Sequence, residues 1–123
     1  FTTGDRFSRV DDQPAFAPER LVCVYDQWLY PERVRVARLE IVWFENGDFS
    51  VHYHEAHENS EFDHRWDRHP SDHNTRDHVH RGPDAPTPGT DTSHPSDWRD
   101  VLSTVLSEVE DRQRAFWEEQ SSP

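Results

Sequence analysis

The pair Asn46-Gly47 lies between two stretches rich in aromatic and β-branched residues, and it constrains the fold more than any other feature. Asn-Gly between apolar runs is the strongest short-range signal for a β-hairpin. Residues 33–45, which precede it, read as one long strand. With a two-residue loop, three pairs of residues face one another across the hairpin: Phe44 and Phe49, Val42 and Val51, and Arg38 and Glu55. The pair therefore predicts an antiparallel sheet with a defined register.

This register assigns the side chains of the hairpin to two faces of the sheet. One face carries a set of apolar residues, which are Phe44, Val42, Phe49, Val51 and Tyr53. The opposite face places His52 and His54 beside a second apolar group, made up of Trp43, Ile41 and Leu39. Histidines against an apolar wall are typical of a binding pocket or of a protein interface. We therefore expect a cleft or a homodimer contact at this wall.

Further elements can be placed on both sides of the hairpin. The other expected strands are residues 20–30, 61–69 and 75–81, the last two joined by a polar turn around Pro70. Residues 1–19 read as a loose N-terminal arm because Pro14 and Pro18 interrupt them. Residues 82–96 are rich in proline and glycine, and they read as an extended connection without structure of its own.

The C-terminal part predicts a helix over residues 97–118, followed by a tail over residues 119–123. Ser96 suits the N-cap, and Asp97 and Asp100 place negative charge near the positive end of the helix dipole. Apolar residues recur at helical spacing and predict the buried face: Trp98, Val101, Leu102, Val105, Leu106, Val109, Phe116 and Trp117. The elements predict an α+β fold in a single domain over residues 20–118, an antiparallel sheet of four to five strands with one long C-terminal helix packed on one face.

The charged residues of the chain are unusual. All 13 basic residues are arginine, while 25 acidic residues give a formal net charge of −12. A lysine-free, acidic chain with one isoleucine is typical of cytosolic proteins from organisms that keep molar salt in the cell. At molar salt, repulsion between the chain and nucleic acid is screened. The negative charge therefore does not exclude RNA as a partner.

The compartment follows from the single cysteine and the hydropathy. Cys23 has no second cysteine to pair with, which favours a reducing cytoplasm, and its place in an apolar run favours a buried thiol. No stretch of the sequence approaches the 18 or so apolar residues that a membrane span needs. We therefore expect a cytoplasmic protein with no membrane partner.

Residues 65–80 are the most polar and chemically dense stretch of the chain, with four histidines, three arginines and three aspartates. If Trp66 and Val79 point inward on paired strands, alternation brings four side chains together on the other face: Arg65, Asp67, His78 and His80. Groups that exchange a proton near neutral pH then lie beside a permanent cation. The stretch therefore indicates a catalytic site, a metal site or a partner surface.

Cleavage of RNA without a metal is one reaction that these side chains support. His78 and His80 could lie on either side of one phosphate as base and acid. Arg65 or Arg76 could stabilise its charge, and Asp67 could fix the tautomer of a ring or orient an arginine. We take Arg65, Asp67, His78 and His80 as the candidate catalytic set. The candidate substrate-binding residues are Trp66, Arg76, His52, His54 and His73, with Trp43 and Tyr53 as further rings for stacking on a base.

A metal centre is the alternative chemistry. His78-Val79-His80 offers two ligands from one strand, and His73, His69 or Asp67 could add a third ligand to a divalent transition metal such as zinc. The spacing matches no defined zinc-finger or zincin motif. A module that binds a metal or a protein without catalysis therefore stays open beside the ribonuclease, which would need no cofactor.

Three short motifs in this stretch resemble the signature of the TumE-type toxins: Arg65-Trp66-Asp67, then His69-Pro70, then His78-Val79-His80. The expected order of strands and C-terminal helix over residues 20–118 is similar too. The order His69-Pro70 differs from the family pattern, in which proline precedes histidine. The resemblance implies a growth-inhibiting toxin that is neutralised by a DNA-binding antitoxin partner. Ribonuclease action is a separate inference, made from the side chains.

Overall fold

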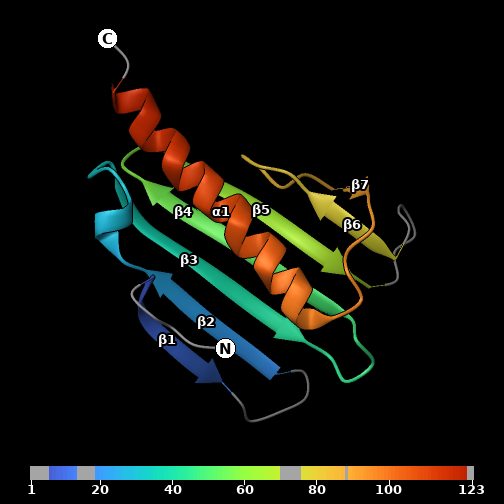
Figure 1. Cartoon of the computed structure of the whole chain (residues 1–123). Helices are drawn as coiled ribbons and strands as arrows, with labels where there is room; N and C mark the ends of the chain where they lie inside the picture. The colour runs from blue at the N-terminus through green and yellow to red at the C-terminus, as the bar shows by residue number, and fades with distance from the viewer. Residues whose placement is uncertain (1–5, 14–18, 70–75, 88, 122–123) are drawn as a thin grey trace.

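The computed structural model describes residues 6–13, 19–69, 76–87 and 89–121. Over these residues the chain forms one seven-stranded antiparallel sheet, in the order β1 to β7, with a long helix α1 across one face (Figure 1). The strands are β1 (Phe7–Gln13), β2 (Glu19–Tyr25), β3 (Val34–Trp43), β4 (Phe49–His57), β5 (Glu61–Arg68), β6 (Asp77–His80) and β7 (Thr90–Asp91). A short 3-10 helix η1 (Gln27–Leu29) follows β2, and α1 spans Trp98–Ser121. The predicted α+β class and the C-terminal helix on one face are confirmed.

The predicted number of four to five strands is wrong, because two elements form where none was expected. The segment predicted as a loose arm contains β1, which pairs with β2 and places the Phe7 ring 4.7 Å from the ring of Tyr25. The connection over residues 82–96 contains β7, which pairs with β6 through Val79 and Thr90. Both elements lie at an edge of the sheet, where pairing is needed on one side only.

The register predicted for the β3–β4 hairpin is wrong by one residue. Trp43 pairs with Phe49 and Ile41 with Val51, and Arg38 pairs with His54 rather than with Glu55. The loop is one residue longer than the predicted two-residue turn, because the amide of Phe44 donates to the carbonyl of Asp48 and Gly47 closes the turn at φ +90°. Because side chains alternate along a strand, a shift of one residue exchanges the β3 side chains that share a face with a given side chain of β4.

The corrected register changes the surroundings of two candidate residues. The aromatic and aliphatic residues of β3 and β4 now share the face under α1: Leu39, Ile41, Trp43, Phe49, Val51 and Tyr53. His52 pairs with Glu40 instead, and His54 pairs with Arg38, on the helix-free face. The expected apolar wall beside these two histidines is therefore not formed. The prediction of a cleft or a homodimer contact rested on that wall and loses its support.

The helix α1 begins at Trp98, one residue later than predicted, and runs to Ser121, into the predicted tail. Asp97, not Ser96, is the N-cap, since its Oδ1 accepts a hydrogen bond of 2.8 Å from the amide of Arg99. The buried part of the predicted stripe is Val101, Leu102, Val105, Val109 and Phe116. The tryptophans at its two ends, Trp98 and Trp117, remain 40% and 42% exposed.

A buried polar network joins α1 to the centre of the sheet. The Glu55 carboxylate is fully buried and accepts hydrogen bonds of 2.6 and 2.8 Å from the guanidinium of Arg112, a third from the Tyr53 hydroxyl and one of 2.7 Å from His57. Burial alone would raise the pKa of Glu55, but these hydrogen bonds outweigh it and lower the pKa. The helix is therefore fixed to β4 by a fully satisfied charge pair as well as by apolar packing.

Candidate functional site

The helix-free face of β4, β5 and β6 carries the candidate residues. Arg65 pairs with His52 on one side and with His80 on the other, and Asp67 pairs with His78. Alternation on β5 puts Arg65 and Asp67 on the face opposite to Trp66, which packs under α1 and donates to Glu108. The structure therefore brings Arg65, Asp67, His78 and His80 together on one face, and it places His52 and His54 on that same face.

The carboxylate of Asp67 is the centre of this arrangement. Its Oδ2 accepts a hydrogen bond of 2.8 Å from Nε of Arg65. The Nε2 atoms of His69, His78 and His80 lie 3.4, 3.5 and 3.2 Å from the same oxygen. Among the described residues, one carboxylate thus faces a guanidinium and three imidazole rings, which we call the Asp67 cluster.

The burial of the Asp67 cluster differs from the sequence expectation. Asp67, His78 and His80 were expected to face outward, yet they are only 0%, 1% and 4% exposed. The side chains of Arg65 and His69 are accessible, at 35% and 43%. The cluster therefore has a buried interior, made by Asp67 and two histidines, and one accessible edge.

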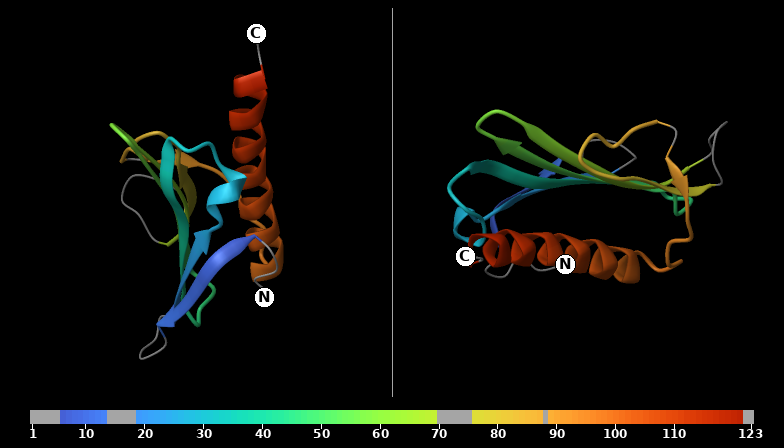
Figure 2. Two further views of the ribbon diagram at one scale, coloured as in Figure 1. Left: turned by 90° about the vertical axis from the view of Figure 1, so that its left-hand side faces the viewer. Right: turned by 90° about the horizontal axis from the view of Figure 1, so that it is seen from above.

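The chain after β6 accounts for part of this burial. In Figure 2 the segment between β6 and β7 rises on the side of the sheet that faces away from α1. Nδ1 of His80 donates a hydrogen bond of 2.7 Å to the carbonyl of Pro86. A Cβ atom at Gly89 would lie 2.8 Å from the carbonyl oxygen of Val79 and 3.0 Å from Cε1 of His80, so a side chain there would collide with the strand. Glycine thus allows the backbone to close over the His80 ring.

A second cluster of titratable groups lies on the same face. Nε2 of His52 and Nδ1 of His54 lie 2.7 and 2.8 Å from one oxygen of Asp63, Oδ1. Burial would raise the pKa of Asp63, but the hydrogen bonds from His54 and His52 outweigh it and lower the pKa. Both rings therefore already have a strong partner, and the side chains are 37%, 15% and 26% exposed for His52, His54 and Asp63.

The other candidate residues that the structure describes have surroundings of their own. Trp66 is 5% exposed beneath α1 and Tyr53 is 1% exposed, so neither ring can stack on a base. Trp43 stacks on Phe49 at 5.0 Å on the helix-covered face. Arg76 pairs with Asp48. His73 lies outside the described residues.

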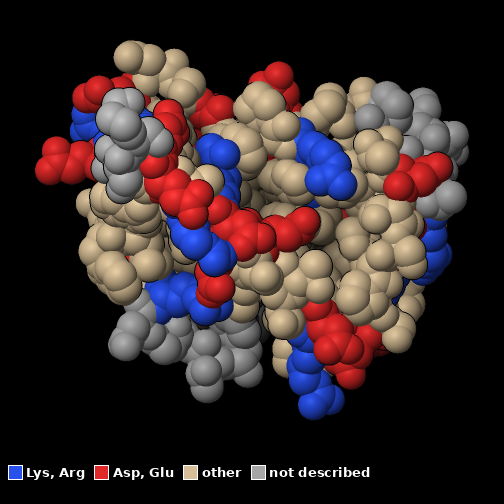
Figure 3. Space-filling view, turned by 45° about the horizontal axis from the view of Figure 1, so that its top comes forward, with Lys and Arg blue, Asp and Glu red and all other residues tan. Residues whose placement is uncertain are grey.

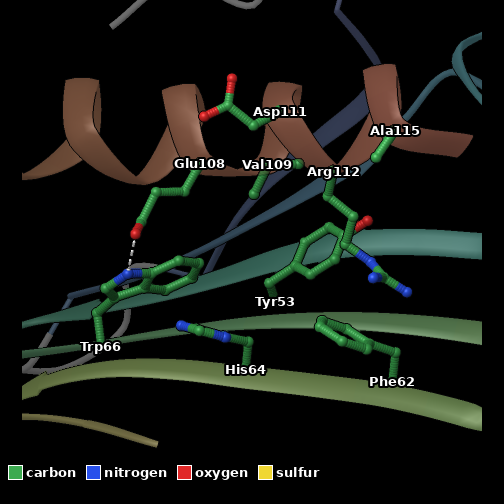
Figure 4. A pocket seen from close by; sticks show the side chains of 9 residues that line it. All are labelled: Tyr53, Phe62, His64, Trp66, Glu108, Val109, Asp111, Arg112 and Ala115. Carbon is green, nitrogen blue, oxygen red and sulfur yellow. Dashed lines mark hydrogen bonds between the residues drawn. The ribbon is translucent and has the colours of Figure 1, made fainter. Parts of the chain in front are cut away.

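A pocket of about 370 Å³ between α1 and β5 was not predicted (Figure 4). Its lining residues are Tyr53, Phe62, His64, Trp66, Glu108, Val109, Asp111, Arg112 and Ala115. Nδ1 of His64 accepts a hydrogen bond of 3.1 Å from the amide of Gly82, and burial, followed by the charges of Arg81 and Arg112, lowers its pKa to about 4. The sequence signal for this side of the pocket is the alternation of Phe62, His64 and Trp66 on β5. Alternate residues of a strand share a face, so the inward placement of Trp66 also places Phe62 and His64 inward.

The surface charge does not form a patch of one sign on the face that Figure 3 shows, where acidic and basic groups lie next to one another. Three of the ion pairs that the arginines make at the surface are Arg20–Glu40, Arg33–Glu119 and Arg35–Glu58. Such pairs contribute little to stability individually. In these pairs the positive charge of each arginine is balanced by a neighbouring carboxylate. An anion would therefore be bound by individual arginines and not by a broad basic surface.

Comparison with known proteins identifies the family. No curated protein and no solved structure matches the chain. No helix in the described parts of the chain is long and apolar enough to cross a membrane. The family described as Toxin TumE matches residues 5–113, which include β1 to β7 and most of α1. The chain therefore belongs to the TumE toxin family, and this membership implies the toxin component of a toxin–antitoxin system, with an antitoxin as its partner.

Proposed function

We propose that this toxin inhibits growth by cleaving RNA at the accessible edge of the Asp67 cluster. The observation that supports the proposal is the convergence of Arg65 and His69 on the buried carboxylate of Asp67, at 2.8 and 3.4 Å. A permanent cation and a proton-exchanging ring, held side by side and open to solvent, are two of the groups that phosphodiester cleavage uses.

Arg65 is the group that would hold the phosphate. Its Nε bonds to Asp67, which fixes the plane of the guanidinium and leaves the two terminal nitrogens as donors for phosphate oxygens. A planar, permanently charged fork suits a phosphate that gains charge in the transition state. Asp67 therefore acts through Arg65, as a positioning residue.

His69 is the accessible acid–base group. Its ring is 43% exposed, whereas His78 and His80 are too deeply buried to reach a phosphate from either side. An oxygen of Asp67 lies 3.4 Å from Nε2 of His69, so the carboxylate holds the ring at the accessible edge beside Arg65. The reaction therefore needs a different division of roles from the His78 and His80 pair that the sequence suggested.

The test is cleavage of total RNA by tag-free protein in molar KCl, with Arg65→Gln and His69→Gln variants. Loss of an acid–base group costs about 100-fold or more in rate, and we expect both variants to fall by at least that factor. Arg99→Gln is the matched control, because Arg99 lies on the exposed outer side of α1 and its side chain is 74% exposed. Cleavage by both site variants at the wild-type rate, or no cleavage by wild type with or without Zn²⁺, would refute the proposal.

A further inference from the structure

The tautomer of His80 is set by the backbone. A carbonyl oxygen can only accept, so the 2.7 Å contact between Nδ1 of His80 and the carbonyl of Pro86 puts a proton on Nδ1. In the neutral ring, Nε2 then carries a lone pair, and it lies 3.2 Å from the carboxylate oxygen of Asp67. Two acceptors at that distance repel each other unless a proton or a cation lies between them.

A cation at the centre of the cluster would meet several ligand atoms at once. Nε2 of His69, His78 and His80 all lie within 3.5 Å of Oδ2 of Asp67. Asp67, His78 and His80 are almost completely buried, so water is largely excluded from the interior of the cluster. A divalent cation held between Nε2 of His80 and the carboxylate would remove the repulsion between these two acceptors.

The spacing of the cluster suits a small transition metal ion. Zn²⁺ binds imidazole nitrogen at about 2.0–2.1 Å in a tetrahedral site, which places neighbouring ligand atoms roughly 3.3–3.4 Å apart. The candidate ligand atoms of Asp67, His78 and His80 lie within 4.8 Å of one another. Their distances from Oδ2 of Asp67, 3.5 and 3.2 Å, match this spacing.

Two buried atoms of the cluster have no hydrogen-bond partner among the described residues, namely Oδ1 of Asp67 and Nε2 of His80. Buried polar atoms without a partner are rare and indicate a missing ligand, water or ion. Metal-bound histidines commonly donate their other ring nitrogen to a carbonyl oxygen, as His80 does to Pro86. We propose that Asp67, His78 and His80 bind a divalent transition metal ion of the zinc type, with the fourth position open on the accessible side, beside His69.

The cluster of His52, His54 and Asp63 is the rival site, since it also combines two histidines with a carboxylate. There the two rings already make hydrogen bonds of 2.7 and 2.8 Å to Asp63, and no buried atom of these three lacks a partner. A metal would have to break these bonds. The Asp67 cluster is therefore the site, and His52 supplies a matched control on the same face of the sheet.

The binding of the metal is independent of the proposed function, whereas any part that the metal plays in RNA cleavage rests on it. Tag-free protein is stripped with a chelator and titrated with Zn²⁺, and metal is counted after gel filtration. We expect about one Zn²⁺ per chain and a higher melting temperature with the metal. Binding should be lost in His80→Gln and Asp67→Asn, weakened about tenfold in His69→Gln, and kept in His52→Gln.

The variants carry their own check on folding, which is circular dichroism at equal concentration. Asp67→Asn keeps the shape of the side chain, so it answers the question if His80→Gln does not fold. Failure of the stripped wild-type protein to bind Zn²⁺ would refute the site whatever the variants do. If His52→Gln loses Zn²⁺ binding and Asp67→Asn keeps it, the metal site is the cluster of His52, His54 and Asp63 instead. Zn²⁺ binding without RNA cleavage would refute the proposed function and leave the metal site in place.

Discussion

Two fully buried carboxylates lie on opposite faces of the same sheet, Glu55 under α1 and Asp67 on the helix-free face. Glu55 accepts hydrogen bonds from Arg112, Tyr53 and His57, and both of its oxygens are used. Oδ2 of Asp67 accepts one from Arg65, while its Oδ1 has no hydrogen-bond partner in the described part of the chain. The two carboxylates are equally buried but differ in how many of their hydrogen bonds are made. Glu55 therefore stabilises the fold, whereas Asp67 is arranged for a ligand.

The largest effect expected from this difference is on stability, at the helix-covered face. Arg112→Ala would leave Glu55 buried with part of its partners removed, and breaking a buried pair costs about 3–5 kcal/mol. The variant also loses the contact of the guanidinium with the ring of Phe62, 3.5 Å from its centroid. Urea unfolding measures the loss in the free energy of unfolding.

Arg99→Ala is the control for this variant, because Arg99 lies on the same helix and is mostly exposed. Its free energy of unfolding should stay within about 0.5 kcal/mol of wild type. Equal losses in the two variants would show that helix propensity or general surface charge, and not the pair with Glu55, is responsible.

The helix-free face should behave in the opposite way. Asp67→Asn keeps the acceptor for Arg65 and removes a buried charge, so we expect the metal-free protein to change by less than about 1 kcal/mol. Zn²⁺ at 100 times its dissociation constant should add about 2.7 kcal/mol to the stability of wild type and nothing to that of the variant. Thermal unfolding with and without Zn²⁺ measures both quantities.

Glu55→Gln is the matched carboxylate-to-amide change on the other face. It should lower the stability of the protein and still leave the full increment from Zn²⁺. A Zn²⁺ increment that falls equally in the two variants would mean that the two faces do not differ in the way proposed.

The sequence predicted those parts of the molecule that depend on local pattern. The helical spacing of the apolar residues from Val101 to Phe116 located α1, and Asn46-Gly47 located the β3–β4 hairpin. The inward placement of Trp66 and Val79 was enough to bring Arg65, Asp67, His78 and His80 to one face, because side chains alternate along paired strands.

What the sequence could not supply depends on single residues and on distant segments. A glycine at positive φ serves both a two-residue and a longer turn. That one-residue difference decided which residues of β3 share a face with His52 and His54. The burial of His80 depends on Pro86 and Gly89, in a connection that has no periodic pattern to read. The pairing of β1 likewise depends on its partner strand β2, at the edge of the sheet.

The histidines of the two faces provide a third, smaller contrast, in pH dependence. Burial lowers the pKa of His64, on the helix-covered face, from 6.5 to about 4. The folded state therefore binds fewer protons than the unfolded state in this interval, so stability is complete above pH 6.5 and is lost as the pH falls toward 4. The slope that one such group contributes is at most about 1.4 kcal/mol per pH unit.

The measurement is urea unfolding of wild type and His64→Gln over this interval. The variant has no proton to bind at this position, so its stability should fall less steeply, and the difference between the two curves isolates His64 from the carboxylates that titrate nearby. His52→Gln is the control on the helix-free face. Parallel curves for wild type and His64→Gln would show that the pKa of His64 is not lowered by the fold.

The smallest effect is expected at the start of α1, and it tests whether the two faces are energetically separate. Asp97→Ala removes the hydrogen bond of 2.8 Å to the amide of Arg99 and should cost about 1 kcal/mol, as the loss of an N-cap usually does. Ser96→Ala should change stability by less than about 0.5 kcal/mol, because Ser96 precedes the cap. Since the cap acts on the helix-covered face, Asp97→Ala should leave the affinity for Zn²⁺ unchanged. A matching loss of Zn²⁺ affinity would mean that the chain from β7 to α1, which joins the two faces, transmits strain to the covering of His80.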